Sequence, residues 1–258
     1  MDLRNAVVVV TGASAGIGEA TALAFARAGS RTVLAARRIE RLEALAGAIR
    51  SRGGEALPIR CDVTEPDDIA GLVESTIGAY GRCDVLVNNA GIPGGGVFRD
   101  VSTEQIERLV RVNLLGVLLV TKAFLPHLLV REAGHVVNVA SVAGRVATPG
   151  AAVYGATKHG VVAFSEALSA ELHPSGILVT AVNPGLTRTE GFPQTGWRRP
   201  FVMKPDRVAE TIVDVVRRER APEVSVPRTL ALFQVVRVIA PPAYRWGMNV
   251  AARRYRPR

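Results

Sequence analysis

Cysteine, histidine and aromatic residues are scarce in this chain of 258 residues. The two cysteines, Cys61 and Cys83, and the four histidines lack the spacing of metal ligands or of a CxxC redox pair, so we expect no metal site. We expect the thiols to be buried and reduced, as in a cytosolic protein. Aromatic residues make up only 5% of the chain, and its main body has no basic stripe with interleaved aromatics, which argues against nucleic acid as a partner.

Long hydrophobic runs are also lacking. The uncharged stretches, such as 85–98 and 112–121, are shorter than the roughly 18 residues that a membrane-spanning helix requires. The valines at 7–10 run directly into a glycine-rich loop, without the apolar segment of a secretory signal. We therefore expect a cytoplasmic protein without a spanning helix.

Positive charge is concentrated at one end of the chain. The net charge is +9, and residues 220–258 contribute +7 of it through eight arginines and a single acid, Glu223. Residues 1–219 are nearly neutral, and hydrophobic residues make up 48% of the whole chain. This composition predicts a compactly folded body with a basic appendage.

Short aliphatic runs alternate with longer amphipathic stretches along the chain. The runs predict strands at 6–10, 32–36, 55–60, 85–88, 135–140, 177–182 and 223–226. The amphipathic stretches predict helices at 16–29, 39–52, 66–81, 103–131, 154–173 and 205–219, with Thr64, Ser102 and Asp206 as capping residues. Because the runs are continuously apolar, the strands should be covered on both faces. The sequence therefore predicts a doubly wound α/β fold, a mostly parallel seven-stranded sheet with helices on both faces.

Residues 1–228 are predicted to form one domain, and residues 229–258 an extension. Four apolar residues of the extension share one helical face: Leu232, Val235, Val236 and Ile239. A basic amphipathic segment of this kind can pack against protein as a subunit arm or a pocket lid, or make peripheral contact with an anionic membrane. A merely solvated end is the third alternative.

A glycine-rich loop, TGASAGIG at residues 11–18, connects the first predicted strand to the first predicted helix. Glycines remove side chains where a backbone must approach a pyrophosphate, and the start of the following helix offers free N–H groups and a partial positive charge. The position of the loop between a strand and a helix favours dinucleotide binding over a simple tight turn.

Together with further motifs in the same order, this loop resembles that of the short-chain dehydrogenase/reductase family, in the branch with TGxxxGIG and YxxxK motifs. The further motifs are Asp62 after the third strand, Asn88, Asn89, Ala90 and Gly91 after the fourth, Asn113, Ser141, Tyr154 and Lys158 of YxxxK, and Pro184 with Gly185. The resemblance covers residues 5–228. It implies a single Rossmann-type catalytic domain and an NAD(P)-dependent oxidoreductase.

The end of the second predicted strand bears on the choice of cofactor. A carboxylate there would bind the adenosine ribose of NAD, but this chain has Arg37 and Arg38 after Ala36. A guanidinium is a planar fork that suits the 2′-phosphate of NADP. We therefore expect NADP(H), with NAD(H) as the alternative if these arginines only form a solvated helix start.

Tyr154 and Lys158 stand four residues apart in a predicted helix, which places both side chains on one face about 6 Å apart. At that distance and an effective dielectric constant of about 20, the lysine cation would lower the pKa of the tyrosine by about two units. Ser141 ends a predicted strand, at the edge of the sheet where doubly wound proteins bind ligands. The three residues together predict a proton-transfer site.

The resemblance assigns roles to these residues. It implies that Tyr154 is the general acid or base, that Ser141 binds the substrate oxygen, and that Lys158 lowers the tyrosine pKa and binds the nicotinamide ribose. Asn113 would hold a water of the proton relay. The cofactor-binding residues expected from the loop, the arginines and the resemblance are Gly12, Ser14, Ala15, Gly16, Ile17, Gly18, Arg37, Arg38, Asp62, Val63, Asn89, Ala90, Gly91, Tyr154, Lys158, Pro184, Gly185, Thr187 and Thr189.

The segment 186–205 contains Phe192, Trp197 and Phe201 among glycines and prolines, and the resemblance implies a mobile segment that covers the substrate. Its aromatics favour an apolar ketone or secondary alcohol, such as a 3-ketoacyl or a steroid- or lipid-like compound. The alternatives are a cofactor-sensing binding protein on the same fold and an NAD-dependent alcohol dehydrogenase of the same family. By analogy with the family, we expect a homodimer or homotetramer.

Overall fold

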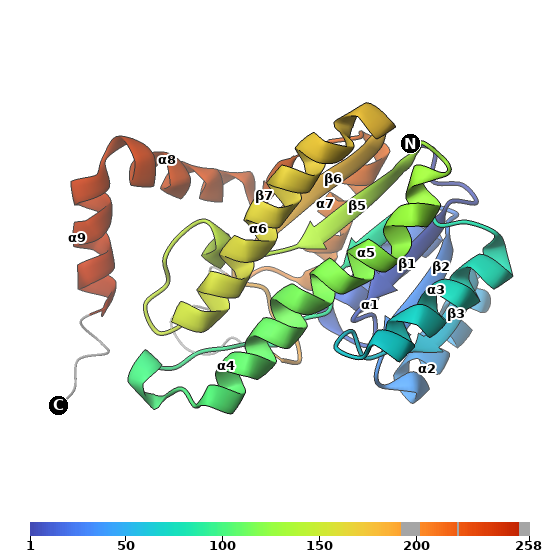
Figure 1. Ribbon diagram of the computed structural model, residues 1–258, viewed down its shortest axis with the longest axis horizontal. Coiled ribbons are helices and arrows are strands. Elements are labelled where there is room, and N and C mark those ends of the chain that lie inside the picture. The colour runs from blue at the N-terminus through green and yellow to red at the C-terminus, as the bar shows by residue number, and fades with distance from the viewer. Residues whose placement is uncertain (192–201, 221, 253–258) are drawn as a thin grey trace.

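A computed structural model describes residues 1–191, 202–220 and 222–252, apart from the side chains of Leu232 and Phe233. Its centre is a seven-stranded sheet in the order β3-β2-β1-β4-β5-β6-β7, in which all neighbouring strands are parallel (Figure 1). The strands are β1 (Val7–Thr11), β2 (Arg31–Ala36), β3 (Glu55–Arg60), β4 (Val85–Asn88), β5 (Gly134–Val139), β6 (Ile177–Pro184) and β7 (Glu223–Val226). The strand order reverses direction between β1 and β4, which confirms the predicted doubly wound fold.

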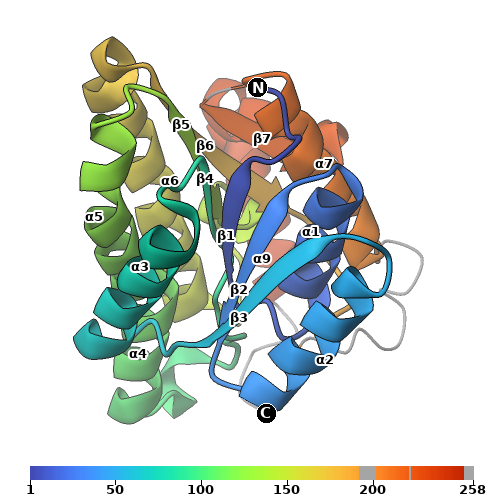
Figure 2. The same cartoon turned by 90° about the vertical axis from the view of Figure 1, so that its right-hand side faces the viewer.

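Helices cover both faces of the sheet (Figure 2). One face carries α1 (Gly16–Arg27), α2 (Ile39–Arg50) and α7 (Pro205–Arg217). The other face carries α3 (Pro66–Tyr80), α5 (Gly116–Leu129) and α6 (Ala152–Leu172). The remaining α-helices of the described ranges are α4 (Thr103–Val110), α8 (Ala231–Ile239) and α9 (Pro241–Ala252). Successive side chains of a strand point to opposite faces, so Val8 and Val10 pack into the first layer, while Val7 and Val9 pack into the second. This two-sided burial explains why β1 has valine at four consecutive positions.

One of the three predicted capping residues caps a helix. Ser102 forms a reciprocal capping box with the residue three positions further on and thereby begins α4. The predictions for Thr64 and Asp206 were wrong, because Pro66 and Pro205 are the first residues of α3 and α7. The N-cap positions are Glu65 and Lys204 instead, and neither makes a side-chain cap hydrogen bond. A proline at the first helical position has its φ already set for a helix, and its missing N–H would have had no partner within the helix.

The predicted helix at 103–131 is a continuous helical stretch, but a π-helical turn (Arg111–Leu115) separates α4 from α5. By length and composition alone this stretch could cross a membrane, although its uncharged runs are too short to do so. However, Val120, Phe124 and Leu128 on its inner side are buried against the sheet. The inner face of α5 therefore belongs to the core of the fold.

The chain leaves the sheet after β7 and continues into α8 and α9, which lie at one end of the molecule (Figure 1). Val238, Ile239 and Trp246 on these two helices are more than two-thirds exposed. The aromatic residues expected to cover a substrate, Phe192, Trp197 and Phe201, lie outside the described residues.

Candidate active site

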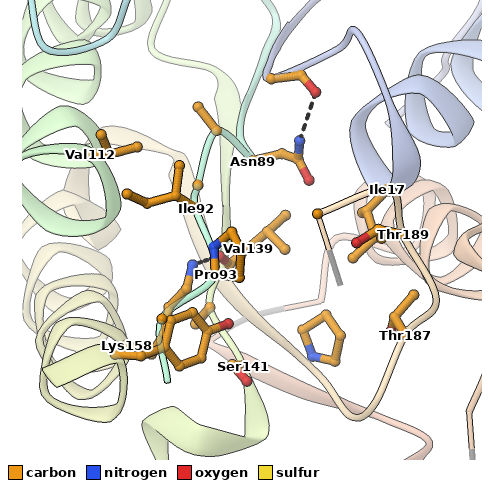
Figure 3. Close-up of a pocket in the computed structure, with 18 of the residues that line it drawn as sticks. Ile17, Asn89, Ile92, Pro93, Val112, Val139, Ser141, Lys158, Thr187 and Thr189 are labelled. Atoms are coloured by element: carbon orange, nitrogen blue, oxygen red, sulfur yellow. Dashed lines mark hydrogen bonds between the residues drawn. The ribbon is translucent and has the colours of Figure 1, made fainter. Parts of the chain in front are cut away.

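A cavity of about 650 Å³ opens at the carboxyl edge of the sheet. The segments that follow strands β1 to β6 line it, through Gly12, Arg37, Asp62, Asn89, Ser141 and Thr187 among others. Figure 3 shows Asn89, Ser141 and Thr187 around it. All the predicted site residues line it except Gly16, Gly18 and Asn113. Residues from positions 12 to 189 thus meet in one place, because the carboxyl ends of parallel strands share one edge.

The glycine-rich loop provides a cradle without side chains. Gly12 and Gly16 have φ values of +66° and +62°, which few other residues adopt. A Cβ atom on Gly18 would lie 2.3 Å from the carbonyl oxygen of Gly12 and 2.5 Å from Nδ2 of Asn89. Ala15, the N-cap of α1, offers no side-chain hydrogen bond to the helix start. The first N–H groups of α1 therefore suit the pyrophosphate of a dinucleotide, and the site fits such a cofactor.

Asn89 holds this loop in place. Its Nδ2 atom donates to the carbonyl oxygens of Thr11 at 2.9 Å and of Gly12 at 3.3 Å (Figure 3). The hydroxyl of Thr11 in turn accepts from the backbone N–H groups of Asn89 and Ala90. Asn89 lines the cavity as predicted, and its carboxamide also ties the end of β4 to the end of β1. Thr11 is the first residue of the TGxxxGIG motif, but this bracing role was not predicted, because it depends on where Asn89 and Ala90 lie.

The arginines after β2 have different partners. Arg37 lies 3.7 Å from a carboxylate oxygen of Asp62. Arg38 instead donates to the hydroxyl of Ser14 through Nε at 3.3 Å and Nη2 at 3.1 Å. Both arginines line the cavity, but it is Arg38 that turns toward the glycine-rich loop. The sequence could not rank the two, because the ranking depends on where Asp62 and Ser14 lie.

Tyr154 and Lys158 occupy the first two turns of α6, opposite Ser141 at the end of β5 (Figure 3). The ammonium nitrogen of Lys158 lies 5.9 Å from the centre of the Tyr154 ring, close to the separation expected from the sequence. Lys158 is 5% exposed, and its Nζ donates to the carbonyl oxygen of Val139 at 2.8 Å. The hydroxyl of Ser141 accepts from the N–H of Ala143, which fixes it at the cavity wall.

Burial sets the protonation of both groups on α6. It lowers the pKa of Lys158 to about 8, because a charged amine is poorly solvated there. It also raises the pKa of Tyr154, and the neighbouring Ser141 hydroxyl only partly opposes this effect. The lowering of the tyrosine pKa expected from Lys158 is not found, because desolvation dominates and Ser141 is the group that opposes it. Tyr154 is a protonated phenol at neutral pH and can donate its proton.

Asn113 lies in the π-helical turn and is fully buried. Its Oδ1 accepts from the N–H of Ile92 at 2.7 Å, and its Nδ2 donates to the carbonyl oxygen of Ile92 at 2.9 Å. A Cβ atom on Gly91 would lie 3.3 Å from Oδ1 of Asn113 and 3.8 Å from Nζ of Lys158, so the three residues are neighbours. The carboxamide thus anchors the segment after β4, a contact that no sequence pattern indicated. Its role in holding a water of the proton relay stays a prediction.

A chain of buried polar side chains lies behind this site. Asn88 on β4 donates to Thr121 on α5 and to Asn138 on β5, both at 2.8 Å. Asn138 donates in turn to Ser165 on α6 at 2.9 Å. Asn88 and Asn138 are directly opposite each other in the sheet register. An asparagine inside an otherwise apolar strand was the only sequence signal for this network, which fixes α5 and α6 against the sheet.

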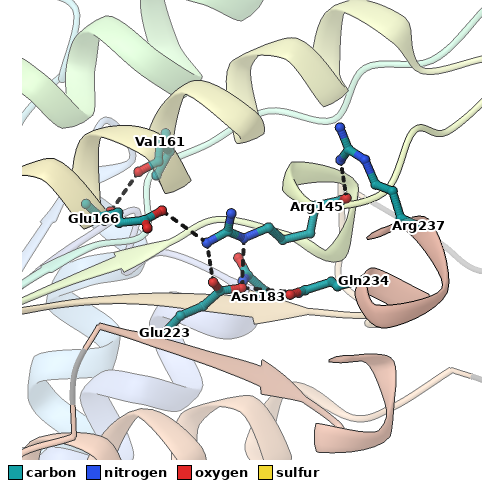
Figure 4. Close-up of polar contacts among 8 residues, drawn as sticks. Arg145, Val161, Glu166, Asn183, Glu223, Gln234 and Arg237 are labelled. Carbon is teal, nitrogen blue, oxygen red and sulfur yellow. Dashed lines mark hydrogen bonds and ion pairs between the residues drawn. The ribbon is translucent and has the colours of Figure 1, made fainter. Parts of the chain in front are cut away.

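The segment after Ser141 is tied to the edge of the sheet through Arg145 (Figure 4). The carboxylate of Glu223 on β7 accepts from the guanidinium of Arg145 and from Nδ2 of Asn183 on β6. Gln234 on α8 donates to the same carboxylate at 3.2 Å. These contacts raise the pKa of Arg145, and its hydrogen bond to Glu223 is the main cause. The lone acid of the basic end of the chain is therefore a structural acceptor.

The extension makes two further contacts with this segment. Arg237 on α8 donates to the carbonyl oxygen of Arg145 at 2.6 Å (Figure 4). The phenol oxygen of Tyr244 on α9 accepts from the N–H of Ala147 at 2.8 Å. Residues 148–151, which follow directly, line the cavity. The described part of the extension thus contacts the chain's own active-site segment.

Comparisons with known proteins agree with this geometry. Residues 6–197 match the family model described as short chain dehydrogenase. An uncharacterized oxidoreductase of Listeria innocua is 37% identical over 226 residues, which cover 82% of this chain and 90% of the relative. A 3-oxoacyl-[acyl-carrier-protein] reductase of a Synechocystis strain is 39% identical over 189 residues, which cover 73% of this chain and 76% of the relative.

Solved structures show the same similarity. A crystal structure of an actinorhodin polyketide ketoreductase variant with NADPH has a TM-score of 0.77 and 36% identity, and covers 82% of this chain and 90% of its own. A short chain dehydrogenase/reductase from Burkholderia phymatum in complex with NAD has a TM-score of 0.83 and 26% identity, and covers 92% of this chain and 94% of its own. The chain therefore belongs to the short-chain dehydrogenase/reductase family and is an NAD(P)-dependent oxidoreductase.

Proposed function

We propose that the protein is an NADP(H)-dependent reductase of apolar ketones, which in reverse oxidises the corresponding secondary alcohols. The observation that carries the proposal is that Ser141, Tyr154 and Lys158 line the same cavity as Ser14 and the arginines after β2. The part of the cavity with Ser141, Tyr154 and Lys158 can transfer a proton, and the part with Ser14 and the arginines can bind a phosphate.

The charges at the end of β2 favour NADP(H) over NAD(H). No acid stands at the end of β2, where Ala36 is followed by two arginines, and Arg38 is already oriented by the hydroxyl of Ser14. A 2′-phosphate carries about two negative charges and accepts from guanidinium forks. The 2′-hydroxyl of the NAD ribose carries no negative charge and offers these guanidinium groups less than a phosphate does. Binding of NADP(H) is therefore favoured.

The state of Tyr154 favours the reductive direction. A bound nicotinamide would supply or accept the hydride at the substrate carbon. The Oη proton of Tyr154 passes to the substrate oxygen, and the hydroxyl of Ser141 donates a hydrogen bond to that oxygen as charge develops on it. Burial disfavours the tyrosinate that remains, so the proton of the neighbouring Lys158 ammonium is positioned to restore the phenol.

The cavity wall bears on the class of substrate. Ile92, Pro93, Val142, Pro149 and Leu186 contribute apolar surface to the cavity. Burial of apolar groups next to the carbonyl against such a wall favours binding, whereas the hydroxyl groups of a sugar would be left there without hydrogen bonds. The names of the Synechocystis and actinorhodin relatives, both reductases of oxoacyl or polyketide compounds, are in line with this substrate class.

A panel of ketones and secondary alcohols tests the proposal, with consumption of NADPH and of NADH followed side by side. We expect turnover of apolar ketones with a preference for NADPH. Tyr154→Phe removes the Oη proton and keeps the ring, so it should abolish turnover while nucleotide binding stays within about twofold. A preference for NADH would contradict the cofactor assignment. Tight NADPH binding without turnover of any compound would favour a cofactor-sensing protein.

A further inference from the structure

A carboxylate and two guanidinium groups meet at the rim of the cavity beyond β2. Arg38 donates through Nη1 to both carboxylate oxygens of Glu190, at 3.2 and 3.1 Å. Arg41 donates through Nη1 at 2.6 Å and through Nη2 at 3.1 Å to the same carboxylate. Arg41 and Arg38 hold the pKa of Glu190 below its usual value, so the group is ionised at neutral pH. Two cations thus converge on a single anion.

This cluster joins three segments that are far apart in the sequence. Arg38 precedes α2 and Arg41 lies in its first turn, while Ser14, the other partner of Arg38, belongs to the glycine-rich loop. Glu190 lies 152 positions after Arg38, on the segment that follows β6. Ser14, Arg38 and Glu190 all line the cavity. The ion pairs therefore connect opposite walls of the cofactor site across its rim.

We propose that Glu190 is an internal competitor for the 2′-phosphate of NADP(H), occupying the guanidinium forks until the phosphate displaces it. The inference rests on the proposed NADP(H) preference. Carboxylates and phosphates both accept from an arginine fork with two oxygens, so one fork serves either anion. The phosphate carries about two charges against one for Glu190, and it therefore gains more from the same two cations.

Displacement of Glu190 by the phosphate costs little free energy because these ion pairs lie at the surface. The side chains of Arg38, Arg41 and Glu190 are 44%, 50% and 51% exposed. Ion pairs at such positions contribute little to stability, so breaking them costs little. Glu190 consequently reduces the affinity for NADP(H) without preventing binding.

The competition also links the cofactor to the segment after β6. Thr189, next to Glu190, contacts the glycine-rich loop: a Cβ atom on Gly16 would lie 2.9 Å from its methyl group. When the 2′-phosphate displaces Glu190, this segment loses its ion pair with Arg41 on α2. NADH has no such phosphate and leaves this ion pair in place. NADP(H) and NAD(H) thus differ in what they do to the substrate-side wall, as well as in affinity.

Glu190→Gln tests the proposal, with Glu40→Gln as a matched control. Glu40 lies in the first turn of α2 and is exposed, and among the described residues it makes no hydrogen bond or ion pair through its side chain. Both variants remove one negative charge near the arginines, but only the first removes the competing anion. The probes are adenosine 2′,5′-bisphosphate and 5′-AMP, titrated calorimetrically into the full-length chain.

We expect Glu190→Gln to bind the bisphosphate about fivefold more tightly than the unchanged chain, since one anion that competes for two surface cations is removed. Its affinity for 5′-AMP, and both affinities of Glu40→Gln, should change less than twofold. Equal tightening by the two variants, or no tightening by Glu190→Gln, would overturn the proposal.

The same titrations distinguish a failure of the competition by Glu190 from a failure of the cofactor assignment. The unchanged chain tests the cofactor assignment, because an NADP(H) site binds the bisphosphate more tightly than 5′-AMP. The comparison of Glu190→Gln with the unchanged chain tests the competition. If only the variant prefers the bisphosphate, Glu190 masks a phosphate site and the competition is supported. If neither prefers it, both ideas fail.

Discussion

Replacing Lys158 with methionine should make the protein more stable at neutral pH in the absence of added cofactor. Burial lowers the pKa of Lys158 from 10.5 to about 8, a difference of about 2.5 units. At about 1.4 kcal/mol per unit, the folded state loses roughly 3.4 kcal/mol when this amine is charged. Methionine removes that cost but also the hydrogen bond to the carbonyl of Val139, worth about 1 kcal/mol. The expected net gain is about 2 kcal/mol.

The gain should depend on pH in a defined direction. Between pH 8 and 10.5 the unfolded chain binds the lysine proton more tightly than the folded chain, so raising the pH through this window stabilises the unchanged protein. The advantage of Lys158→Met should therefore be about 2 kcal/mol at pH 7 and close to zero at pH 10.

Urea unfolding of both chains at pH 7 and pH 10, followed by circular dichroism, measures this difference. Lys122→Met, at an exposed lysine on α5, serves as the control and should change stability by less than about 0.5 kcal/mol. A variant that is less stable at pH 7, or a gain that is the same at both pH values, would refute the reasoning.

Three further outcomes follow from the geometry. Gly18→Ala places a methyl group 2.3 Å from the carbonyl oxygen of Gly12, so calorimetry should show at least about tenfold weaker binding of 5′-AMP; unchanged affinity would contradict the cradle. Tyr244→Phe leaves the N–H of Ala147 without its acceptor, so hydrogen exchange at residues 142–151 should become faster. The KM for ketones should rise about threefold, while the affinity for nucleotide stays constant. Slower catalysis with constant KM would argue against this support of the substrate wall. The kcat/KM for reduction should fall above about pH 8 as Lys158 loses its proton, and a flat profile to pH 10 would exclude it from proton transfer.

Local patterns in the sequence predicted most of the fold. Valine at four consecutive positions, 7–10, indicates a strand buried on both faces, and the structure uses alternate valines for the two layers. The glycine-rich loop and the spacing of Tyr154 and Lys158 are equally local, because a turn and one helix face place these residues. Their neighbourhood therefore follows from secondary structure alone.

Contacts between distant positions were not predictable in the same way. Asn113 binds the backbone of Ile92, and that pairing depends on a π-helical turn that no spacing announces. The partners of Arg38 follow from how the segment after β6 folds back over α2. The pKa of Tyr154 was misjudged because the sequence shows the lysine charge but not the depth of burial.

The proposed function requires an NADP(H)-dependent proton and hydride transfer in this cavity. The most direct test mixes the full-length protein with NADPH and an apolar 3-ketoester, and follows the loss of NADPH absorbance beside Tyr154→Phe and beside the same reaction with NADH. We expect rapid loss with NADPH, slower loss with NADH, and none above background with Tyr154→Phe. Equal rates for Tyr154→Phe and the unchanged chain would contradict the proposed function.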